Sequence, residues 1–470
     1  WYDVFVFEQN KRVGGKMGEL WHEGFRFDTG PSVFTMPELV DRLFKAAGEK
    51  RKDYLQYDKL DKSCRYFFED ETVINAYSDN TAFACELSSK TGEPADHIHE
   101  FLERSRKIYE LTADVFMFHS LRDWKNLFQF KTLRSLLNIR KIDALNTMHQ
   151  SNKKQFKSDK LVQLFDRYAT YNGSDPCRIP ATFNIISHLE HNMGVYYPRG
   201  GIFSIARGMH HLMEKLGVHI FLNDSVRRIL PGRKGNHTLV ADSGEYRFDY
   251  VVSNMDINYF YDDVLKDDRL MNKARKPEKS SSALIFYWGI NGRFPDLELH
   301  NILFSGDYPR EFDFLFTRKE VYSDPTVYIY ISSRQVRQDA PEGKENWYVM
   351  VNAPEHIGQN WDHIKNEVRR NIITKINRML GVQIQDHIEC EVIHDPPAIE
   401  QQTGSYHGSL YGNSSNGRFA AFKRHPNYTG KYPGIFFTGG SVHPGGGIPL
   451  CLSSARIVSE KIDRDEKKRQ

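Results

Sequence analysis

The sequence predicts an α/β fold in which a Rossmann-type domain is interleaved with a mixed-sheet domain and a helical part. Two observations predict the Rossmann-type domain. Residues 1–8 (WYDVFVFE) form a β-rich run that ends in a carboxylate, and Gly14 and Gly15 follow soon after. Near the other end, IFFTGG and then SSARIVSEKI predict a strand, a glycine turn and a helix. At 470 residues the chain is long for one hydrophobic core, so a second domain is expected.

The first run matches the second strand of a dinucleotide-binding fold, because that strand ends in an acid. In such folds a glycine-rich turn lies about 20 residues before the acid. We therefore expect a segment of roughly 25 to 30 residues, carrying this glycine fingerprint, upstream of Trp1.

Periodicity predicts the elements that follow. Residues 54–78 alternate between apolar and polar side chains and predict a hairpin pair of strands. Residues 94–167 are almost free of Gly and Pro and predict several helices. Residues 194–230 then predict a helix followed by a strand.

The second half predicts another sheet. Its strands are expected in SALIFYWGI, TVYIYIS and WYVMVNAP, which begin at Ser282, Thr326 and Trp347. Residues 361–380 predict an amphipathic helix, and the final DRDEKKRQ predicts a solvated tail.

Composition excludes several classes of protein. No stretch approaches about 18 consecutive apolar residues, so a membrane-spanning helix is not expected. The five cysteines form no CxxC pair, which argues against a zinc site or a disulfide framework and favours a reducing cytoplasm. The net charge of +3 does not indicate nucleic-acid binding. The 31 Phe and 24 Tyr residues favour a large apolar cavity, although they could equally fill a core.

The first candidate site lies after the opening strand. Glu8 is placed where a carboxylate would accept two hydrogen bonds from ribose hydroxyls; the alternative is a strand-end acid in solvent. Arg12, Gly14 and Gly15 form an RxGG run, in which backbone approaches a pyrophosphate and the guanidinium adds charge. The small-residue turn Gly30-Pro31-Ser32 would bring further backbone N–H groups to a flavin.

The second candidate site is the loop TGGSVHPGGGIP, residues 438–449, which carries five glycines and two prolines. Such a loop lets main chain pass over a planar cofactor. The helix that starts near Ile448 and Pro449 would point its positive N-terminus at a flavin pyrimidine. His443 is either a general base or a loop histidine held by a backbone carbonyl.

Over essentially its whole length the sequence resembles the bacterial-type phytoene desaturase family of FAD-dependent carotenoid desaturases. The matching segments are FEQNKRVGGKM, GFRFDTGPSVFTMPELVDRLF, GVYYPRGGIFSIARGM and FFTGGSVHPGGGIPLCLSSARI. The resemblance implies an FAD-dependent oxidoreductase that acts on a carotenoid. It also implies FAD contacts from Glu8, Arg12, Gly14, Gly15, Gly439, Gly440, Gly446 and Gly447, and from the backbone of Val226, on the strand after the YPRGG helix, to adenine.

Two short signatures are similar to the hydroxyneurosporene (1-hydroxycarotenoid 3,4-) desaturase branch. They are Lys16-Met17 and Val33-Phe34-Thr35-Met36. This similarity implies formation of a C3–C4 double bond in an acyclic end group that bears a C1 hydroxyl. The alternatives are a phytoene or diapophytoene desaturase, a carotenoid isomerase or oxidase, an amine oxidase of the same superfamily, and a flavin-binding scaffold without catalysis.

The resemblance also divides the chain. Residues 1–53, 195–265 and 425–470 are expected to form the FAD-binding domain. Residues 54–100 and 266–424 are expected to form the substrate-binding domain, with residues 101–194 as a helical, membrane-facing part.

Residues 116–157 carry nine Lys or Arg against two Asp, interleaved with aromatic and Leu side chains. A basic amphipathic helix of this kind attracts anionic lipid; the alternative is a surface helix packed on its own core. Trp124, Phe128, Lys131 and Arg134 are the expected membrane contacts. The family resemblance implies a cytoplasmic protein held peripherally on the inner face of the cell membrane, where carotenoids dissolve.

The segment Tyr171-Asn172-Gly173-Ser174-Asp175-Pro176 resembles the family's loop near the flavin. Tyr171 and Asn172 are candidate substrate contacts. Asp175 is a candidate base, with an Asx-turn or helix-capping role as its alternative. No metal ligand set is expected.

Overall fold

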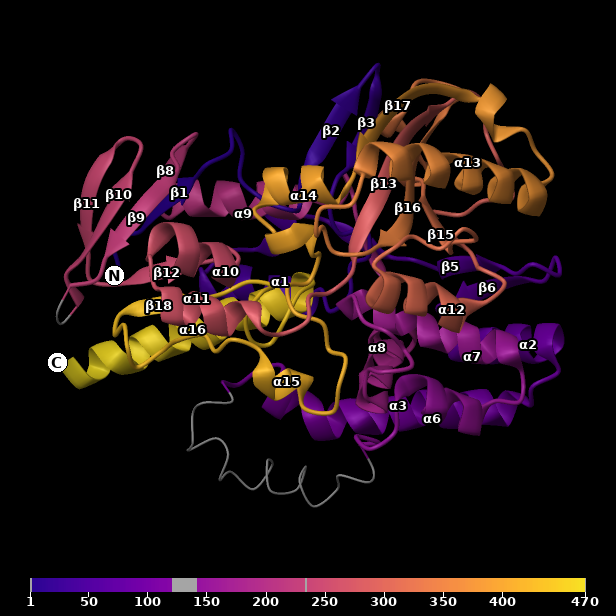
Figure 1. Cartoon of the computed structure of the whole chain (residues 1–470), viewed down its shortest axis with the longest axis horizontal. Coiled ribbons are helices and arrows are strands. Elements are labelled where there is room, and N and C mark those ends of the chain that lie inside the picture. The colour runs from indigo at the N-terminus through magenta and orange to yellow at the C-terminus, as the bar shows by residue number, and fades with distance from the viewer. Residues whose placement is uncertain (1, 121–141, 233–234, 470) are drawn as a thin grey trace.

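Two pairs of parallel strands join distant parts of the chain in the computed structural model, which describes residues 2–120, 142–232 and 235–469. Strand β1 (Phe5–Glu8) pairs with β8 (His219–Leu222). Strand β12 (Val251–Ser253) pairs with β18 (Ile435–Phe437). Parallel pairs need crossover connections, and helix α9 (Phe203–Lys215) directly precedes β8 while helix α16 (Ile448–Arg469) follows β18 (Figure 1). The predicted α/β architecture is confirmed.

A seven-stranded sheet forms the second layer system, in the order β17-β13-β16-β15-β14-β5-β6. Neighbours are antiparallel except β14 and β5. Its strands are β5 (Lys62–Phe67), β6 (Val73–Tyr77), β13 (Ser282–Ile290), β14 (His300–Leu303), β15 (Val327–Tyr330), β16 (Glu345–Ala353) and β17 (Ile388–His394). The sheet is therefore mixed, and the predicted hairpin lies at its edge.

Both faces of this sheet are covered, so all nine residues of β13 are buried. Leu284, Phe286 and Trp288 point to helix α13 (Trp361–Leu380), whose inner face carries Val368, Ile372 and Ile376. Burial of each such helix side chain stabilises the fold by about 1.5 to 3 kcal/mol. The alternate side chains, with Ile285 and Tyr287, pack with the nucleotide-binding part instead.

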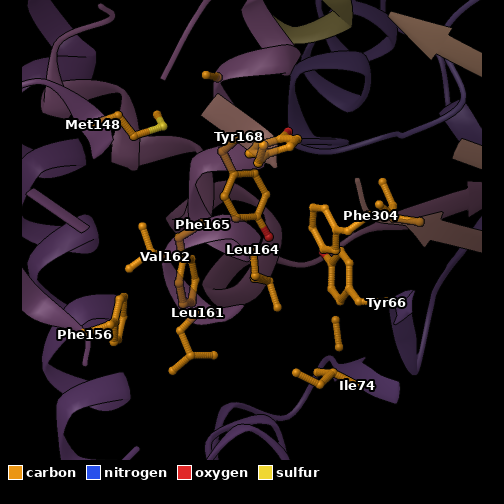
Figure 2. Packing of buried hydrophobic residues seen from close by; sticks show 14 of the residues in the cluster. Tyr66, Ile74, Met148, Phe156, Leu161, Val162, Leu164, Phe165, Tyr168 and Phe304 are labelled. Carbon is orange, nitrogen blue, oxygen red and sulfur yellow. The ribbon is translucent and has the colours of Figure 1, made fainter. Parts of the chain in front are cut away.

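Helices pack under the β5–β6 edge of the sheet. The described helices are α2 (Asn80–Thr91), α3 (Ala95–Phe116), α6 (Met148–Gln155), α7 (Asp159–Asp166) and α8 (Ile185–Ser187). Figure 2 shows how Phe156, Leu161 and Phe165 from this part gather opposite Tyr66 and Phe304 of the sheet side. Residues 121–141, with the expected membrane contacts Trp124, Phe128, Lys131 and Arg134, lie outside the described residues.

The remaining elements complete the two units. The helices are α1 (Glu38–Ala46), α9 (Phe203–Lys215), α10 (Ile257–Tyr259), α11 (Asp268–Arg275), α12 (Tyr308–Asp313), α14 (Pro396–Thr403), α15 (Ala420–Lys423) and α16 (Ile448–Arg469). The further strands are β2 (Glu19–His22), β3 (Phe25–Asp28), β4 (Tyr57–Lys59), β7 (Tyr196–Pro198), β9 (Val226–Leu230), β10 (His237–Ala241) and β11 (Gly244–Phe248).

Two expectations are corrected. The final DRDEKKRQ is not a tail, because α16 begins directly after Gly447 and continues to Arg469. Val226 does not lie on the strand that follows the YPRGG helix: β8 holds that place, and Val226 opens β9 of a separate antiparallel sheet. Within the described residues, no helix is long and apolar enough to cross a membrane. The glycine fingerprint expected upstream of Trp1 stays a prediction.

Candidate functional site

The carboxylate that ends β1 is held by the residue two positions on. Oε1 of Glu8 accepts hydrogen bonds from the backbone N–H and the side-chain amide of Asn10, both at 2.8 Å. The chain returns beside it, because the backbone N–H of Asp224 donates to the carbonyl of Glu8 at 2.9 Å. Val226 follows Asp224 by two residues, so its backbone lies close to Glu8, the predicted ribose contact.

Two turns of the nucleotide-binding part cross with their main chains in contact. A Cβ on Gly30 would lie 1.9 Å from the carbonyl oxygen of Lys16, so no side chain fits there. Gly14 has φ +112°, and a Cβ on it would lie 2.3 Å from the carbonyl oxygen of Met17. The glycines of the RxGG and GPS motifs thus allow this crossing, and Arg12 fixes it by donating to the carbonyl of Glu19.

Two glycines border open space. Gly15 has φ +56° and Gly447 has φ +101°, and apart from their own chain neighbours no atom of the described residues lies within 4 Å of the position of a Cβ on either one. Gly447 immediately precedes the first residue of α16. A positive φ beside open space gives an exposed main-chain surface, as a closely approaching ligand requires.

Two cations, the half-buried Lys16 and the buried Arg424, lie near these glycines. Lys16 donates from Nζ to the carbonyl of Leu410 at 2.7 Å, and Arg424 donates to the carbonyls of Tyr411 and Asn413 at 3.2 and 2.9 Å. Neither forms an ion pair with a carboxylate among the described residues. Burial lowers the pKa of Lys16, and it lowers the pKa of Arg424 to about 10.

Cys451, in the first turn of α16, lies close enough to both cations for each of them to affect the pKa of its thiol. Burial raises the pKa of its thiol, while Lys16 and Arg424 both act against that rise. Both cations are therefore close to the glycine-rich loop. An open main-chain surface with these two cations nearby fits a planar, anionic cofactor such as FAD.

Tyrosines face the glycine-rich loops from the seven-stranded sheet and its neighbours. Tyr328 donates to Ser32 Oγ at 2.7 Å, and its hydroxyl also lies 2.8 Å from Nδ1 of His300. Burial raises the pKa of Tyr171 and Tyr328, and it raises the pKa of Tyr411 to about 12. All three nevertheless keep part of their accessible surface. Each of the three tyrosines can therefore contact a bound ligand with the part of its surface that stays accessible.

His443 and Asp175 both make contacts with the neighbouring main chain of the kind that their structural alternatives predict. Nε2 of His443 lies 2.9 Å from the carbonyl of His119, so the ring donates to a backbone carbonyl, and burial lowers its pKa to about 4. Asp175 accepts from the backbone N–H of Cys177 at 2.7 Å, an Asx turn before Pro176. Burial raises the pKa of Asp175.

An ion network joins the nucleotide-binding part to the seven-stranded sheet and the turn that follows β15. Arg26 contacts Glu19, Asp28 and Asp339 at 2.8, 2.8 and 3.1 Å. Asp28 also accepts from the first N–H groups at the start of α9, at 3.0 and 3.1 Å, and from Tyr330 of β15 at 2.9 Å. Asp28 therefore ties the nucleotide-binding part to the sheet.

Sequence reasoning missed Arg424 and Tyr328. Arg424 follows the exposed Lys423 in a loop segment, and nothing in that local sequence distinguishes a buried cation from a surface one. Tyr328 and Tyr330 are two positions apart on a predicted strand, so their common face could have been predicted.

The chain matches the family described as flavin containing amine oxidoreductase over residues 2–463. It is 43% identical to a 1-hydroxycarotenoid 3,4-desaturase of Flavobacterium sp. (strain P99-3), over 98% of this chain and 94% of that protein. It is 31% identical to a 4,4'-diapolycopene oxygenase of Methylomonas sp., over 99% and 94%.

The fold has solved counterparts. A putrescine oxidase mutant superposes with a TM-score of 0.63 at 13% identity and covers 99% of this chain and 94% of its own. Cyclohexylamine oxidase from Brevibacterium oxydans IH-35A gives 0.59 at 12% identity, over 99% and 94%. These solved structures share the fold of this chain. The chain belongs to the flavin-containing amine oxidoreductase family and is an FAD-dependent oxidoreductase related to the carotenoid desaturases.

Proposed function

We propose that this protein is a carotenoid desaturase that introduces a C3–C4 double bond into a 1-hydroxylated acyclic end group. The observation that carries the proposal is 43% identity, over 98% of the chain, to a protein named for this reaction. The diapocarotenoid oxygenases among the relatives stand at 31% or lower. Desaturation is therefore favoured over oxygenation.

We assign FAD to the residues that border the open main-chain surface. Glu8 would bind the adenosine ribose and the backbone of Val226 the adenine, while Arg12, Gly14 and Gly15 would bind the pyrophosphate. The flavin would lie between the turn Gly30-Pro31-Ser32 and the loop residues Gly439, Gly440, Gly446, Gly447, Ile448 and Pro449. When bound, the flavin supplies the hydride acceptor.

The reaction removes one hydride and one proton from neighbouring carbons, and a C3–C4 double bond forms. C4 is allylic to the polyene, so positive charge that develops there is delocalised. The adjacent C3 proton is then strongly acidic, so the reaction does not require Asp175 as a base. The protein needs mainly to position the end group and to exclude water. The partly accessible side chains of Tyr171, Tyr328 and Tyr411 would contact the end group and keep water away from it.

We assign FAD binding to residues 1–53, 195–265 and 425–470 and substrate binding to residues 54–100 and 266–424. Strands from both substrate segments share the seven-stranded sheet, which supports that assignment. Tyr171 and Asn172 are assigned to the substrate side, because Asn172 accepts from Arg424 at 3.0 Å beside the glycine-rich loop.

We also propose that the protein binds peripherally to the cytoplasmic face of the membrane, because its substrate is dissolved in the lipid bilayer. Two aromatic side chains support this proposal: Phe419 and Phe422 are 67% and 56% exposed. Arg418 and Lys423 are exposed beside them. Phe422 also contacts Phe116, at the end of the helix that leads to residues 121–141.

The test is a product assay with FAD-loaded protein in liposomes. A 1-hydroxylated acyclic carotene is expected to give a product that has lost two hydrogens and absorbs at longer wavelength. Phytoene should be used poorly. Efficient stepwise desaturation of phytoene, without activity on the hydroxylated carotene, would assign the chain to the phytoene desaturases. A product that gains oxygen would assign it to the oxygenases.

A further inference from the structure

A charged pair is buried between the helical part and the sheet. Arg167 and Glu190 are only 6% and 3% exposed. Three tyrosine rings, Tyr66, Tyr168 and Tyr171, surround the guanidinium, whose carbon lies 4.8 to 5.2 Å from their centroids. A buried ion pair is costly to desolvate, so its presence in an enzyme for a hydrocarbon substrate calls for a reason.

The donors of Arg167 are incompletely used. Its Nη2 atom donates to Tyr66 Oη at 2.8 Å, but the contacts to Glu190 Oε1 and Tyr171 Oη are long, at 3.5 and 3.4 Å. Its Nε atom is buried and has no hydrogen-bond partner among the residues that the structure describes. A buried guanidinium therefore keeps a free donor, although an unpaired buried donor is unfavourable.

Glu190 keeps spare acceptor capacity on one oxygen. Oε1 accepts from Tyr168 at 3.1 Å and from Ser63 at 3.3 Å, whereas Tyr171, at 2.5 Å, is the one donor to Oε2 within the described part of the chain. Glu190 also lies on a π-helical turn, His188–Met193. Such turns are rare and are frequent at functional sites.

The cluster is next to the cofactor side of the molecule. Tyr171 precedes Asn172, which Arg424 binds at 3.0 Å, and Arg424 also donates to the carbonyl of Gly440 at 3.4 Å. Tyr171 is the member of the cluster that retains accessible surface. Tyr66 and Tyr168, both labelled in Figure 2, are fully buried. Tyr171 thus forms the boundary between the buried ion pair and the accessible space.

We propose that Arg167 and Glu190, together with Tyr171, recognise the C1 hydroxyl of the substrate end group. This inference rests on the proposed function and names its specificity-determining residues. A hydroxyl both accepts and donates one hydrogen bond. Arg167 supplies the free donor, and Glu190 with Tyr171 supplies the acceptor. A substrate without the hydroxyl leaves these groups unpaired and is therefore rejected.

The test compares two acyclic carotenes that differ only in the C1 hydroxyl. For the FAD-loaded parent protein, kcat/KM should be at least about 100-fold higher for the hydroxylated carotene. Because removal of one partner would strand a buried charge, the main variant is the double change Arg167→Met with Glu190→Gln. Its preference should fall by about 10- to 100-fold. Tyr171→Phe, which keeps the ring, should lower it several-fold.

Tyr308→Phe is the matched control, because Tyr308 is also a buried tyrosine of this core and its hydroxyl has no hydrogen-bond partner. It should keep the parental preference. Binding of both carotenes to dithionite-reduced protein gives a second readout that does not depend on turnover. There the double variant should lose affinity for the hydroxylated carotene alone.

The outcomes separate this inference from the proposed function. If the parent does not use the hydroxylated carotene, the proposed function fails. If the parent prefers the hydroxylated carotene and both the double variant and Tyr171→Phe keep that preference, the function stands and the inference is wrong. A merely structural ion pair would lower the melting temperature of the double variant without changing the preference.

Discussion

The Nζ atom of Lys16 donates a hydrogen bond to the carbonyl oxygen of Leu410 across 2.7 Å, although 394 positions separate the two residues. The bond joins the glycine turn after β1 to the segment that runs toward Tyr411. It holds a half-buried cation next to Gly15. The position of the charge is thus set by main-chain geometry, because no carboxylate among the described residues pairs with it.

Lys16→Met should weaken FAD binding. The change keeps the length of the side chain and removes its charge and its hydrogen bond to Leu410. We expect about a tenfold increase in the Kd for FAD, which corresponds to about 1.4 kcal/mol. Flavin fluorescence titration measures it. Lys11→Met, at an exposed position of the same segment, should bind FAD as the parent does; equal losses in both variants would contradict the role of Lys16.

Gly447→Leu should abolish FAD binding. The side chain would enter the open space beside Gly447, where, apart from its chain neighbours, no atom of the described residues lies within 4 Å of a Cβ. The positive φ of +101° adds backbone strain, so a control must carry the same strain. Gly343→Leu does so, because Gly343 has φ +80°, is exposed and also has no atom within 4 Å. We expect flavin absorbance after reconstitution in the control and none in Gly447→Leu.

Acid should destabilise the protein through buried histidines. Burial lowers the pKa of His443 from 6.5 to about 4, and it also lowers the pKa of His191 and His300. Above pH 6.5 the ring is neutral in both states. As pH falls from there toward 4, the unfolded chain binds more protons than the folded one, so stability falls.

His443→Gln isolates one of these contributions. Between about pH 7 and pH 5, urea unfolding should show a loss smaller by about 2 kcal/mol than in the parent protein. Glutamine can still donate to the carbonyl of His119. His363→Gln, at an exposed position, should leave the parental pH dependence unchanged. A parental slope in His443→Gln would contradict the assignment.

The elements with strong periodicity were predictable. The helix predicted over residues 361–380 has those bounds in the structure, because its apolar positions face the sheet. Strand β13 was likewise predicted as an unbroken apolar run. The charged end of α16 was not, since DRDEKKRQ carries no apolar stripe and its helix extends from the packed turns before it.

The candidate site was predictable where glycine geometry determines it. The contacts of Gly14 and Gly30 with main chain follow from their motifs. Arg167, Glu190 and Arg424 were not predictable, because each has at least one hydrogen-bond partner more than 100 positions away in the sequence. Arg167 and Tyr66, for example, are 101 positions apart. Tertiary packing brings the members of such pairs together.

Asp28→Asn should destabilise the protein strongly. Asp28 is 1% exposed and accepts from Arg26, from the start of α9 and from Tyr330. Removing its charge leaves Arg26 with fewer counter-charges in a buried place, and the expected loss is about 3 to 5 kcal/mol. Tyr330→Phe removes one neutral donor and should cost only about 1 kcal/mol. Urea unfolding compares them; similar small losses would contradict a central role for Asp28.

Liposome binding should depend on Phe419 and Phe422. Insertion of an exposed Phe side chain into lipid contributes about 1.5 to 3 kcal/mol, so the double change to Ser should weaken binding by at least about tenfold. The exposed basic residues Arg418 and Lys423 should make binding stronger on anionic vesicles and weaker in salt. Trp21→Ser is the matched control, since Trp21 is 59% exposed on β2. Vesicle sedimentation measures all three proteins. Equal binding to neutral and anionic vesicles at low salt would rule out the electrostatic contribution, and an equal loss in Trp21→Ser would show that the contact is not confined to this patch.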